Sequence, residues 1–369
     1  MECGHHYVEV ISHAMQRKIY DLSFTSVGQL GCSCPVKCNY MNAFRQVQGW
    51  AFKIKVTPVI SSIMLFQTGA VAALSVQEYF PEIGTDLTVV TWGHAVNSQQ
   101  KLQDALTEKL MMLEADVVLG TLEGGSGEEI PVMAHPPDNV SDLSLENFLT
   151  EVMSATQKGH RCGIKLDFKT VEVLQPSLSQ LKAYEKQISF PVMLNADILP
   201  GPVSSPTKPV DADTFLDLST RLFPSSTLSV GWTTRYGGLI FTGTYSEEQV
   251  EAMREALQRH RVAQPVTFPV RAGLVANSGE TLARLMSIPN TTFTIWSGDY
   301  DAVNVTRLRE VILDVLGRDR VFVDVPKSLS DKLQLSSNDT QRDSSAAVFL
   351  PSIIAILAAT VTSILNKFK

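Results

Sequence analysis

Residues 163–195 read GIKLDFKTVEVLQPSLSQLKAYEKQISFPVMLN, and this stretch indicates how the chain folds. Two short apolar runs, 163–168 and 192–195, flank residues 171–187, where apolar positions recur at helical spacing. A strand, a helix and a second strand in this order form a βαβ unit, whose strands lie parallel in one sheet. The stretch therefore predicts an α/β fold.

The same alternation extends in both directions, over residues 86–326. The strand-like runs are 87–92, 115–119, 130–134, 163–168, 192–195, 227–231, 266–270 and 293–296, and the helical patterns are 99–112, 145–158, 171–187, 212–222, 246–261, 279–286 and 303–316. Eight strands in this arrangement predict a (β/α)8 TIM-type barrel. Residues 120–129 are glycine-rich and too short for a helix, and 321–325 form a ninth run, which we expect to be a closing strand outside the barrel.

The composition suits one large globular domain and excludes several classes of protein. The chain has 369 residues, 44% of them hydrophobic and 19% charged, with a net charge of -7. No run of basic residues is long enough to follow a phosphate backbone, so we expect no nucleic-acid partner. Five cysteines are too few for a disulfide scaffold at this length.

Polar side chains gather where the predicted strands end, which is where barrels of this type carry their chemistry. Glu114 and Asp116 are two residues apart and share one face of a strand, and Asp167 comes from a later strand. Three carboxylates that face one another repel, and a hard cation relieves the repulsion by taking oxygen ligands. The three residues predict a site for Mg²⁺ or Ca²⁺, since no cysteine or histidine set calls for zinc.

Two histidines and a lysine lie at further strand ends, and together with a metal ion they indicate phosphodiester cleavage. His94 and His135 follow different strands and can act as general acid and base, while Lys169 carries a charge suited to a phosphate. A metal ion would stabilise the anionic oxygens of such a substrate. Other polar or aromatic residues at strand ends are predicted to line the substrate pocket: Asn195, Asp197, Trp232, Arg271, Trp296 and Asp299.

The order and wording of these motifs resemble a known group of proteins. The motifs are Gly93-His94-Ala95-Val96-Asn97, Glu114-Ala115-Asp116-Val117, His135, Leu166-Asp167-Phe168-Lys169-Thr170 and Trp296-Ser297-Gly298-Asp299. They resemble the phospholipase-C-like phosphodiesterase barrels, among them the glycerophosphodiester phosphodiesterases and the sphingomyelinase D toxins, and resemble the menorin family more closely still. The similarity covers about residues 86–326.

The resemblance implies roles for single residues. It places His94 and His135 at acid–base positions, the three carboxylates at metal positions, Lys169 on the phosphate, and Asn97 and Trp296 in the pocket. It also implies a second reading. Menorin-like proteins are known chiefly as extracellular or membrane-tethered proteins that act with cell-surface adhesion molecules, so the barrel would then be a non-catalytic binding scaffold in neuronal or tissue patterning.

The N-terminal part of the chain differs in character from the barrel. Residues 53–77 have a basic flank, an apolar centre and small residues at the end, which is typical of a secretory signal. We interpret them as a signal or signal-anchor; the alternatives are that residues 1–52 are a spurious extension, or that 53–77 form a buried helix. Residues 1–52 are expected to be a poorly ordered extension. Four cysteines fall there, and metal binding or palmitoylation are open alternatives for Cys32, Cys34 and Cys38.

The C-terminal end is predicted to anchor the protein to a membrane. Residues 346–365 carry no charge and are long enough to cross a bilayer, and residues 327–345 form a polar spacer before them. The pattern fits a glycolipid-anchor signal with attachment near 336–338, or a membrane-spanning tail. The sequons at Asn139, Asn290, Asn304 and Asn338 are candidates for glycosylation. Together these features predict an extracellular or cell-surface location, with a phosphodiester small molecule or lipid as ligand.

Overall fold

The computed structural model describes residues 73–237 and 239–335. The strands are β1 (Trp92–Gly93), β2 (Met112–Leu122), β3 (Ile130–Met133), β4 (Val140–Ser141), β5 (Gly163–Phe168), β6 (Val192–Pro200), β7 (Thr227–Thr233), β8 (Val266–Arg271), β9 (Thr291–Trp296) and β10 (Val321–Asp324). The longer helices are α5 (Gln99–Thr107), α6 (Leu145–Gln157), α7 (Leu174–Tyr184), α8 (Ala212–Leu222) and α9 (Glu247–Arg259).

Short helical segments complete the described part of the chain. They are α4 (Val76–Tyr79), η1 (Pro81–Ile83), η2 (Leu87–Val89), α10 (Ala272–Val275), α11 (Gly279–Ala283), η3 (Arg284–Ser287), α12 (Val305–Glu310), the π-helix η4 (Val311–Leu316), η5 (Arg318–Arg320) and α13 (Lys327–Leu333).

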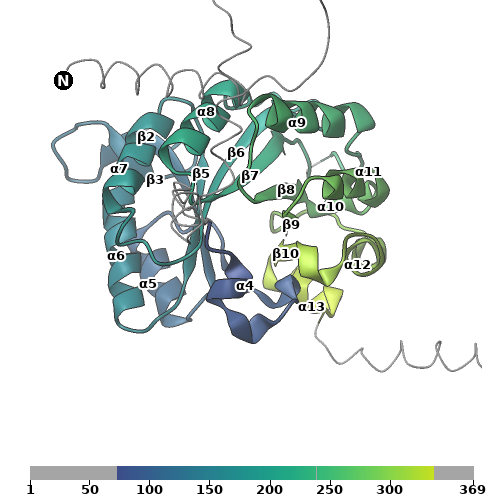
Figure 1. Cartoon of the computed structure of the whole chain (residues 1–369), viewed down its shortest axis with the longest axis horizontal. Coiled ribbons are helices and arrows are strands. Elements are labelled where there is room, and N and C mark those ends of the chain that lie inside the picture. Colours follow the sequence, from purple (N-terminus) through teal and green to yellow (C-terminus); the bar gives the residue numbers. More distant parts are fainter. Residues whose placement is uncertain (1–72, 238, 336–369) are drawn as a thin grey trace, which may run out of the picture. The chain divides into compact units, whose positions relative to one another are not determined.

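Eight parallel strands form a nearly closed barrel, in the order β1-β2-β5-β6-β7-β8-β9-β10. The helices lie around the outside of the strands (Figure 1). Because all eight strands run the same way, their carboxyl ends meet at one mouth of the barrel, which is where the site residues are expected. The prediction of a (β/α)8 barrel is confirmed.

The set of strands that make the barrel differs from the prediction in three places. Residues 87–89 form a 3-10 turn, and β1 has only two residues. Strand β3 runs antiparallel to β2, because the connection between them is too short for a crossover helix and turns back at Gly124 and Gly127, both with positive φ. Strand β10, expected outside the barrel, pairs parallel with β9 and is one of the eight.

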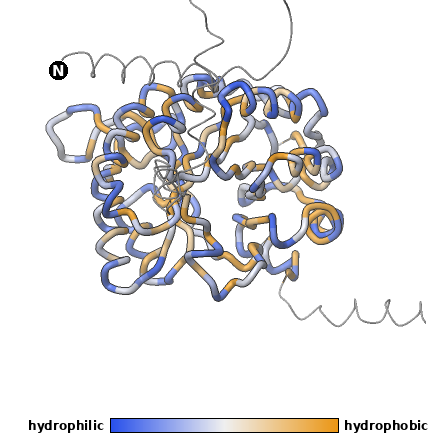
Figure 2. The backbone as a smooth tube through the Cα atoms, viewed as in Figure 1, coloured by the Kyte–Doolittle hydropathy of each residue, from blue (hydrophilic) through white to orange (hydrophobic). Residues whose placement is uncertain are grey.

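The helices bury one side against the barrel because their apolar residues recur every three to four positions. In α6 the buried side chains are Leu145, Phe148, Leu149, Val152 and Met153, and Ser144 caps the helix by accepting from the Asn147 N–H. Hydrophobic and hydrophilic segments alternate along the surrounding helices in Figure 2. The result is one continuous core between strands and helices.

A separate apolar cluster covers the amino-terminal end of the barrel. Its buried members are Val76, Phe80, Ile83, Leu87, Val90, Met112, Met193 and Phe322. Met112 and Met193 lie at or near the beginnings of β2 and β6, so the cluster packs against the end of the barrel opposite the polar strand ends. The polar strand ends lie at the other end of the barrel, its carboxyl mouth.

The expected terminal segments fall mostly outside the described residues. Of residues 53–77, only 73–77 are described, and Ser75 there caps helix α4. Residues 327–333, expected to begin a polar spacer, form helix α13, and Leu329 and Leu333 pack into the core. The expected extension 1–52 and anchor 346–365 lie outside the described residues. Within residues 73–237 and 239–335, no helix has the length and hydropathy needed to cross a bilayer.

Candidate functional site at the mouth of the barrel

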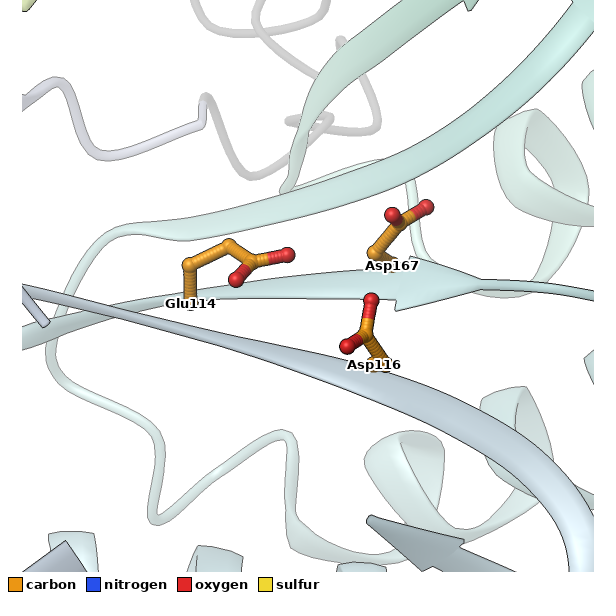
Figure 3. Close-up of side chains that lie close together, drawn as sticks. All are labelled: Glu114, Asp116 and Asp167. Atoms are coloured by element: carbon orange, nitrogen blue, oxygen red, sulfur yellow. The ribbon is translucent and has the colours of Figure 1, made fainter. Parts of the chain in front are cut away.

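Three carboxylates point into the same space at the mouth of the barrel (Figure 3). Glu114 and Asp116 come from β2 and Asp167 from β5, and one oxygen of each lies within 4.8 Å of the other two. The strand register explains the grouping, because Asp116 pairs directly with Asp167 and Glu114 shares the face of Asp116. The structure thus brings together the three residues expected to bind a metal ion.

Neighbouring groups hold the two carboxylates of β2 in place. Asn97 donates from its Nδ2 to Asp116 Oδ2 at 2.7 Å, and its Oδ1 accepts from the Asp116 N–H at 2.9 Å. The backbone N–H of Ala95 donates to Glu114 Oε2 at 2.8 Å. Ala95 has φ +51°, an uncommon conformation for alanine that turns this N–H toward the site. Asn97, expected in the substrate pocket, therefore also positions a carboxylate.

Asp167 is held by a chain of polar contacts across three strands. Asn195 on β6 donates from Nδ2 to Asp167 Oδ1 at 2.5 Å, and Ser229 on β7 donates to Asn195 Oδ1 at 2.5 Å. These residues share one register row of the sheet. Ser229 supports Asn195, and the sequence pattern does not identify it. Ser229 and Gly231 are two residues apart on β7 and therefore face the same side, and Gly231 faces the barrel interior beside Asp197.

Lys169 lies between two of the carboxylates. Its Nζ is 2.7 Å from Asp116 Oδ1 and 2.5 Å from Asp167 Oδ2. Burial opposes the charge, but Asp167 and Asp116 outweigh it and raise the pKa of the lysine. Burial likewise opposes ionisation of Asp167, but Lys169 and Lys165 lower the pKa of that carboxyl. The lysine is a fixed cation at this position.

Lys165 is a second cation of the site that the sequence did not single out. It lies on β5, pairs in register with Glu114, lines the cavity and is only 4% exposed. Residues 165, 167 and 169 alternate along the strand and so face the same interior, which is the signal that could have identified it. Lysines are rarely buried without carboxylates nearby, and this one lies among several.

Two carboxylates of the cavity are difficult to ionise. Burial, and then the charge of Asp116, raise the pKa of Glu114 to about 7. Burial, and then the charge of Asp167, raise the pKa of Asp197 to about 7. Both carboxylates lie where an added cation would favour the charged form.

His94 is held by a carboxylate from the last strand of the barrel. Its Nδ1 lies 2.9 Å from Asp324 Oδ2 and 3.7 Å from Glu114 Oε2. Desolvation of the ring opposes protonation, but the hydrogen bond to Asp324 and the charges of Asp324 and Glu114 outweigh it and raise the pKa of His94 to about 9. The sequence does not point to Asp324, because it predicts the run 321–325 outside the barrel, whereas the structure makes it the barrel strand β10.

His135 approaches the cavity from a different kind of element. It lies in the loop after the antiparallel strand β3, is exposed, and its Nδ1 is 2.8 Å from the carbonyl oxygen of Pro136. Both histidines line one cavity of about 630 Å³, together with the carboxylates, Lys165, Lys169 and Asn97. The two imidazoles reach this cavity from separate segments of the chain.

The far side of the same cavity is built by β8 and β9. Arg271 and Trp296 end these strands, pair in register and line the cavity. Arg271 donates from Nε and Nη2 to the two oxygens of Asp301, at 2.7 and 2.8 Å. The expected residue Asp299 is exposed and does not line the cavity. The carboxylate that contacts Arg271 is that of Asp301.

Trp232 does not belong to the cavity. Its side chain is 1% exposed, packs against Tyr245 and Phe268, and donates from Nε1 to the carbonyl oxygen of Gln249. The inward positions of β7 are Ser229, Gly231 and Thr233, so residue 232 faces the helices. The expectation that Trp232 lines the pocket is corrected.

The candidate glycosylation sites lie on the surface where they are described. Asn139, Asn290 and Asn304 are exposed, and the Oδ1 of Asn304 caps helix α12 by accepting from the Arg307 N–H. Asn338 lies outside the described residues. Glycosylation at these sites remains a prediction.

The acidic cluster fits a divalent cation. The three carboxylates Glu114, Asp116 and Asp167 share two lysines of the cavity lining, Lys165 and Lys169, so one carboxylate of this group has no lysine to balance it. The spacing of the Glu114, Asp116 and Asp167 oxygens allows one ion to contact all three. These residues could therefore hold a divalent metal ion.

Fold and site together define a TIM barrel with an acidic cluster at its carboxyl mouth. Residues 86–330 match the family model described as the Menorin N-terminal domain. The chain is 40% identical to Protein FAM151B from Homo sapiens over 237 aligned residues. The alignment covers 64% of this chain and 82% of that protein. The chain belongs to the menorin family.

Solved structures similar to this chain are distant from it. A glycerophosphoryl diester phosphodiesterase from Parabacteroides distasonis is 13% identical, with a TM-score of 0.39, over 73% of this chain and 97% of that one. The PLC21 protein of S. officinalis is 12% identical, with a TM-score of 0.27, over 68% and 33%.

Proposed function

We propose that this menorin-family protein is a metal-dependent phosphodiesterase that hydrolyses a lipid or glycerol phosphodiester. The observation that carries the proposal is the convergence on one cavity of Glu114, Asp116 and Asp167, Lys169, and the two histidines His94 and His135. Each type of group has a part in phosphodiester cleavage, and the cavity places all of them within reach of one ligand.

In this proposal, different side chains of the cavity bind the metal ion and the phosphate. Glu114, Asp116 and Asp167 would hold Mg²⁺ or Ca²⁺, both of which prefer oxygen ligands. The bound ion supplies charge stabilisation for the anionic phosphoryl oxygens. Lys169, fixed by Asp116 and Asp167, binds the phosphate beside it.

The imidazoles move the protons. Because Nδ1 of His94 is engaged by Asp324, Nε2 is the atom that exchanges a proton with the substrate. His94 and His135 serve the attacking and the leaving oxygen, one as general base and the other as general acid. Asn97 and Asn195 keep the carboxylates in position throughout.

The proposal extends to where the protein works. The uncharged segments 56–77 and 346–365 and the four sequons support an extracellular or membrane-anchored glycoprotein. A barrel delivered to the cell surface would meet lipid headgroups and their glycerol phosphodiester products. Release of the protein from cells by a glycolipid-cleaving phospholipase distinguishes a glycolipid anchor from a spanning tail.

The test is hydrolysis of glycerol phosphodiesters by the full-length protein with Mg²⁺, with Ca²⁺ and with a chelator. We expect turnover with one of the cations, none with the chelator, and loss of turnover in the double variant His94→Ala, His135→Ala. His260→Ala is a matched control, since His260 also pairs with a carboxylate, Asp213, but does not line the cavity. Activity that survives in the double variant contradicts the mechanism.

A second candidate function is a binding scaffold for cell-surface adhesion proteins. It is favoured by large apolar side chains exposed on two loops after β7 and β9: Leu239 is 96% exposed, Phe241 52% and Tyr300 94%. Tyr236 joins these loops, since its hydroxyl oxygen lies 2.5 Å from the carbonyl oxygen of Ala302 and 3.0 Å from that of Phe241, and its one O–H can donate to either. If this function holds, Leu239→Ser with Tyr300→Ser abolishes partner capture at the cell surface, and the double histidine variant leaves it intact.

A further inference from the structure

In the cavity wall, the guanidinium group of Arg271 lies over the aromatic face of Trp296. The guanidinium carbon of Arg271 lies 4.9 Å from the centre of the Trp296 ring and 5.5 Å from that of Tyr236. A cation over an aromatic face is the arrangement by which proteins recognise quaternary ammonium groups such as choline. Here a side chain of the chain itself takes that position.

Several contacts fix Arg271 in this position. Asp301 binds it through two hydrogen bonds, is itself only 4% exposed, and accepts a further bond from the Gly298 N–H at 3.2 Å. Tyr236 packs against Gly273, where an added Cβ would lie 2.3 Å from the tyrosine ring. The guanidinium therefore cannot withdraw from the ring without breaking a buried ion pair.

The arrangement still leaves hydrogen-bond donors available to a ligand. Asp301 accepts from the Nε–H and from one N–H of Nη2. Nη1 of Arg271 has no hydrogen-bond partner among residues 73–237 and 239–335. Arginine has five such donors, and it binds carboxylates and phosphates better than it binds any cation. Both oxygens of Asp301 already accept from the guanidinium, and this side chain is only 4% exposed, so the pair offers a cationic ligand little exposed acceptor surface.

We infer that Arg271, supported by Trp296 and Asp301, forms an anion-binding subsite beside the phosphate position, and that the preferred substrate is a phosphodiester whose second substituent carries a carboxylate or phosphate. Headgroups with a quaternary ammonium are rejected, because the ring that would hold them is covered and the guanidinium repels them. Two further lysines on the cavity lining, Lys101 and Lys208, have the same sign of charge and favour the same ligands. The inference rests on the proposed function for the phosphate itself.

The experiment compares three phosphates on one short carbon frame: phosphoglycolate, ethyl phosphate and phosphocholine, which end in a carboxylate, a methyl group and a trimethylammonium. Their affinities for the full-length protein with Ca²⁺ are measured by calorimetry. We expect phosphoglycolate to bind about tenfold more tightly than ethyl phosphate, and phosphocholine more weakly than both. In Arg271→Gln the three affinities should come within about twofold of each other.

Two further variants keep the test independent of folding. Arg271→Lys retains the positive charge and should keep part of the preference for phosphoglycolate. Arg235→Gln removes the same charge from an exposed position on the neighbouring loop that does not line the cavity, and should bind all three probes as the native protein does.

The outcomes separate this inference from the proposed function. Phosphocholine binding as tightly as phosphoglycolate overturns the subsite, and so does a preference for phosphoglycolate that persists in Arg271→Gln, since the carboxylate would then lie on the metal ion. If none of the three phosphates binds, the phosphate site itself is wrong and both proposals fall. If the expected order is found in a protein that hydrolyses nothing, the subsite stands and only the catalytic function fails.

Discussion

The two walls of the cavity differ in their balance of charges. On the wall of β2 and β5, Glu114, Asp116 and Asp167 share Lys169 and Lys165, and negative charge remains in excess. On the wall of β8 and β9, Arg271 and Asp301 are paired one to one, and the pair lies against aromatic rings. An excess of carboxylates calls for a metal ion, whereas a balanced, rigid pair is suited to recognising a ligand.

The largest effect is expected on the acidic wall. Asp167→Asn removes one of the three carboxylates, so metal affinity should fall by at least about a hundredfold and any hydrolysis by about a thousandfold. Calorimetric titration with Mg²⁺ and Ca²⁺ measures the first quantity. Asp217→Asn, at an exposed position of α8, is the matched control. Unchanged metal binding in Asp167→Asn would remove the metal site from this wall.

Lys165→Met tests whether the buried lysine compensates the carboxylates. Removing this cation leaves them facing one another, so the metal-free protein should lose about 3 kcal/mol of unfolding free energy. Added metal ion should restore part of that loss, which makes the gain in Tm on adding Ca²⁺ larger in the variant than in the native protein. Lys182→Met, at a half-exposed lysine of α7, should change neither quantity. An equal gain in both proteins would argue against the compensation.

The pairing of His94 with Asp324 predicts a dependence on pH. The pKa of His94 is raised to about 9 from 6.5, so protonation stabilises the folded state fully below pH 6.5, and this stabilisation is lost as the pH rises through about 9. Asp324→Asn removes the main partner, and the pKa of His94 should fall toward 6.5. Titration of the His94 ring by NMR in the metal-free protein measures it. A pKa that stays near 9 would mean that Glu114 alone sustains the shift.

The smallest effect on metal binding is expected from the opposite wall. Asp301→Asn breaks a buried ion pair and should lower the free energy of unfolding by about 3 kcal/mol, but Asp301 belongs to a different group of charges from the metal-binding carboxylates. Affinity for Ca²⁺ should therefore change by less than about twofold. A large change would show that the two walls act as one charged network and would end the distinction between them.

Much of the acidic wall could be predicted from the chain alone, because it depends on short-range patterns. Spacing of two residues places Glu114 with Asp116 on one face of a strand, and the alternation of strands and helices brings Asp167 to the same edge. The second wall could not be predicted in the same way. Asp299 and Asp301 are indistinguishable as sequence, and only the path of the loop after β9 decides which of them meets Arg271.

The places of β3 and β10 differ from the prediction for one reason. The run 130–134 has the pattern of a barrel strand, so the sequence predicts eight strands without 321–325, whereas the structure pairs β3 antiparallel with β2 and makes β10 the eighth barrel strand. Asp324, the partner of His94, lies on that strand, so the sequence does not point to it. Direction of pairing between strands depends on how the intervening chain packs, and a short apolar run has the same pattern in either direction.

The amino-acid sequence is sufficient to predict the class of fold, the alternation of strands and helices, and the carboxylates, histidines and Lys169 at the strand ends. These follow from local periodicity, which a single strand or helix already expresses. Four contacts could be found only in the folded structure: Lys165 is buried beside Glu114, Asp324 holds His94, Trp232 faces the helices, and Arg271 covers Trp296. Those contacts join residues far apart in the chain, and closure of the barrel is what brings them together.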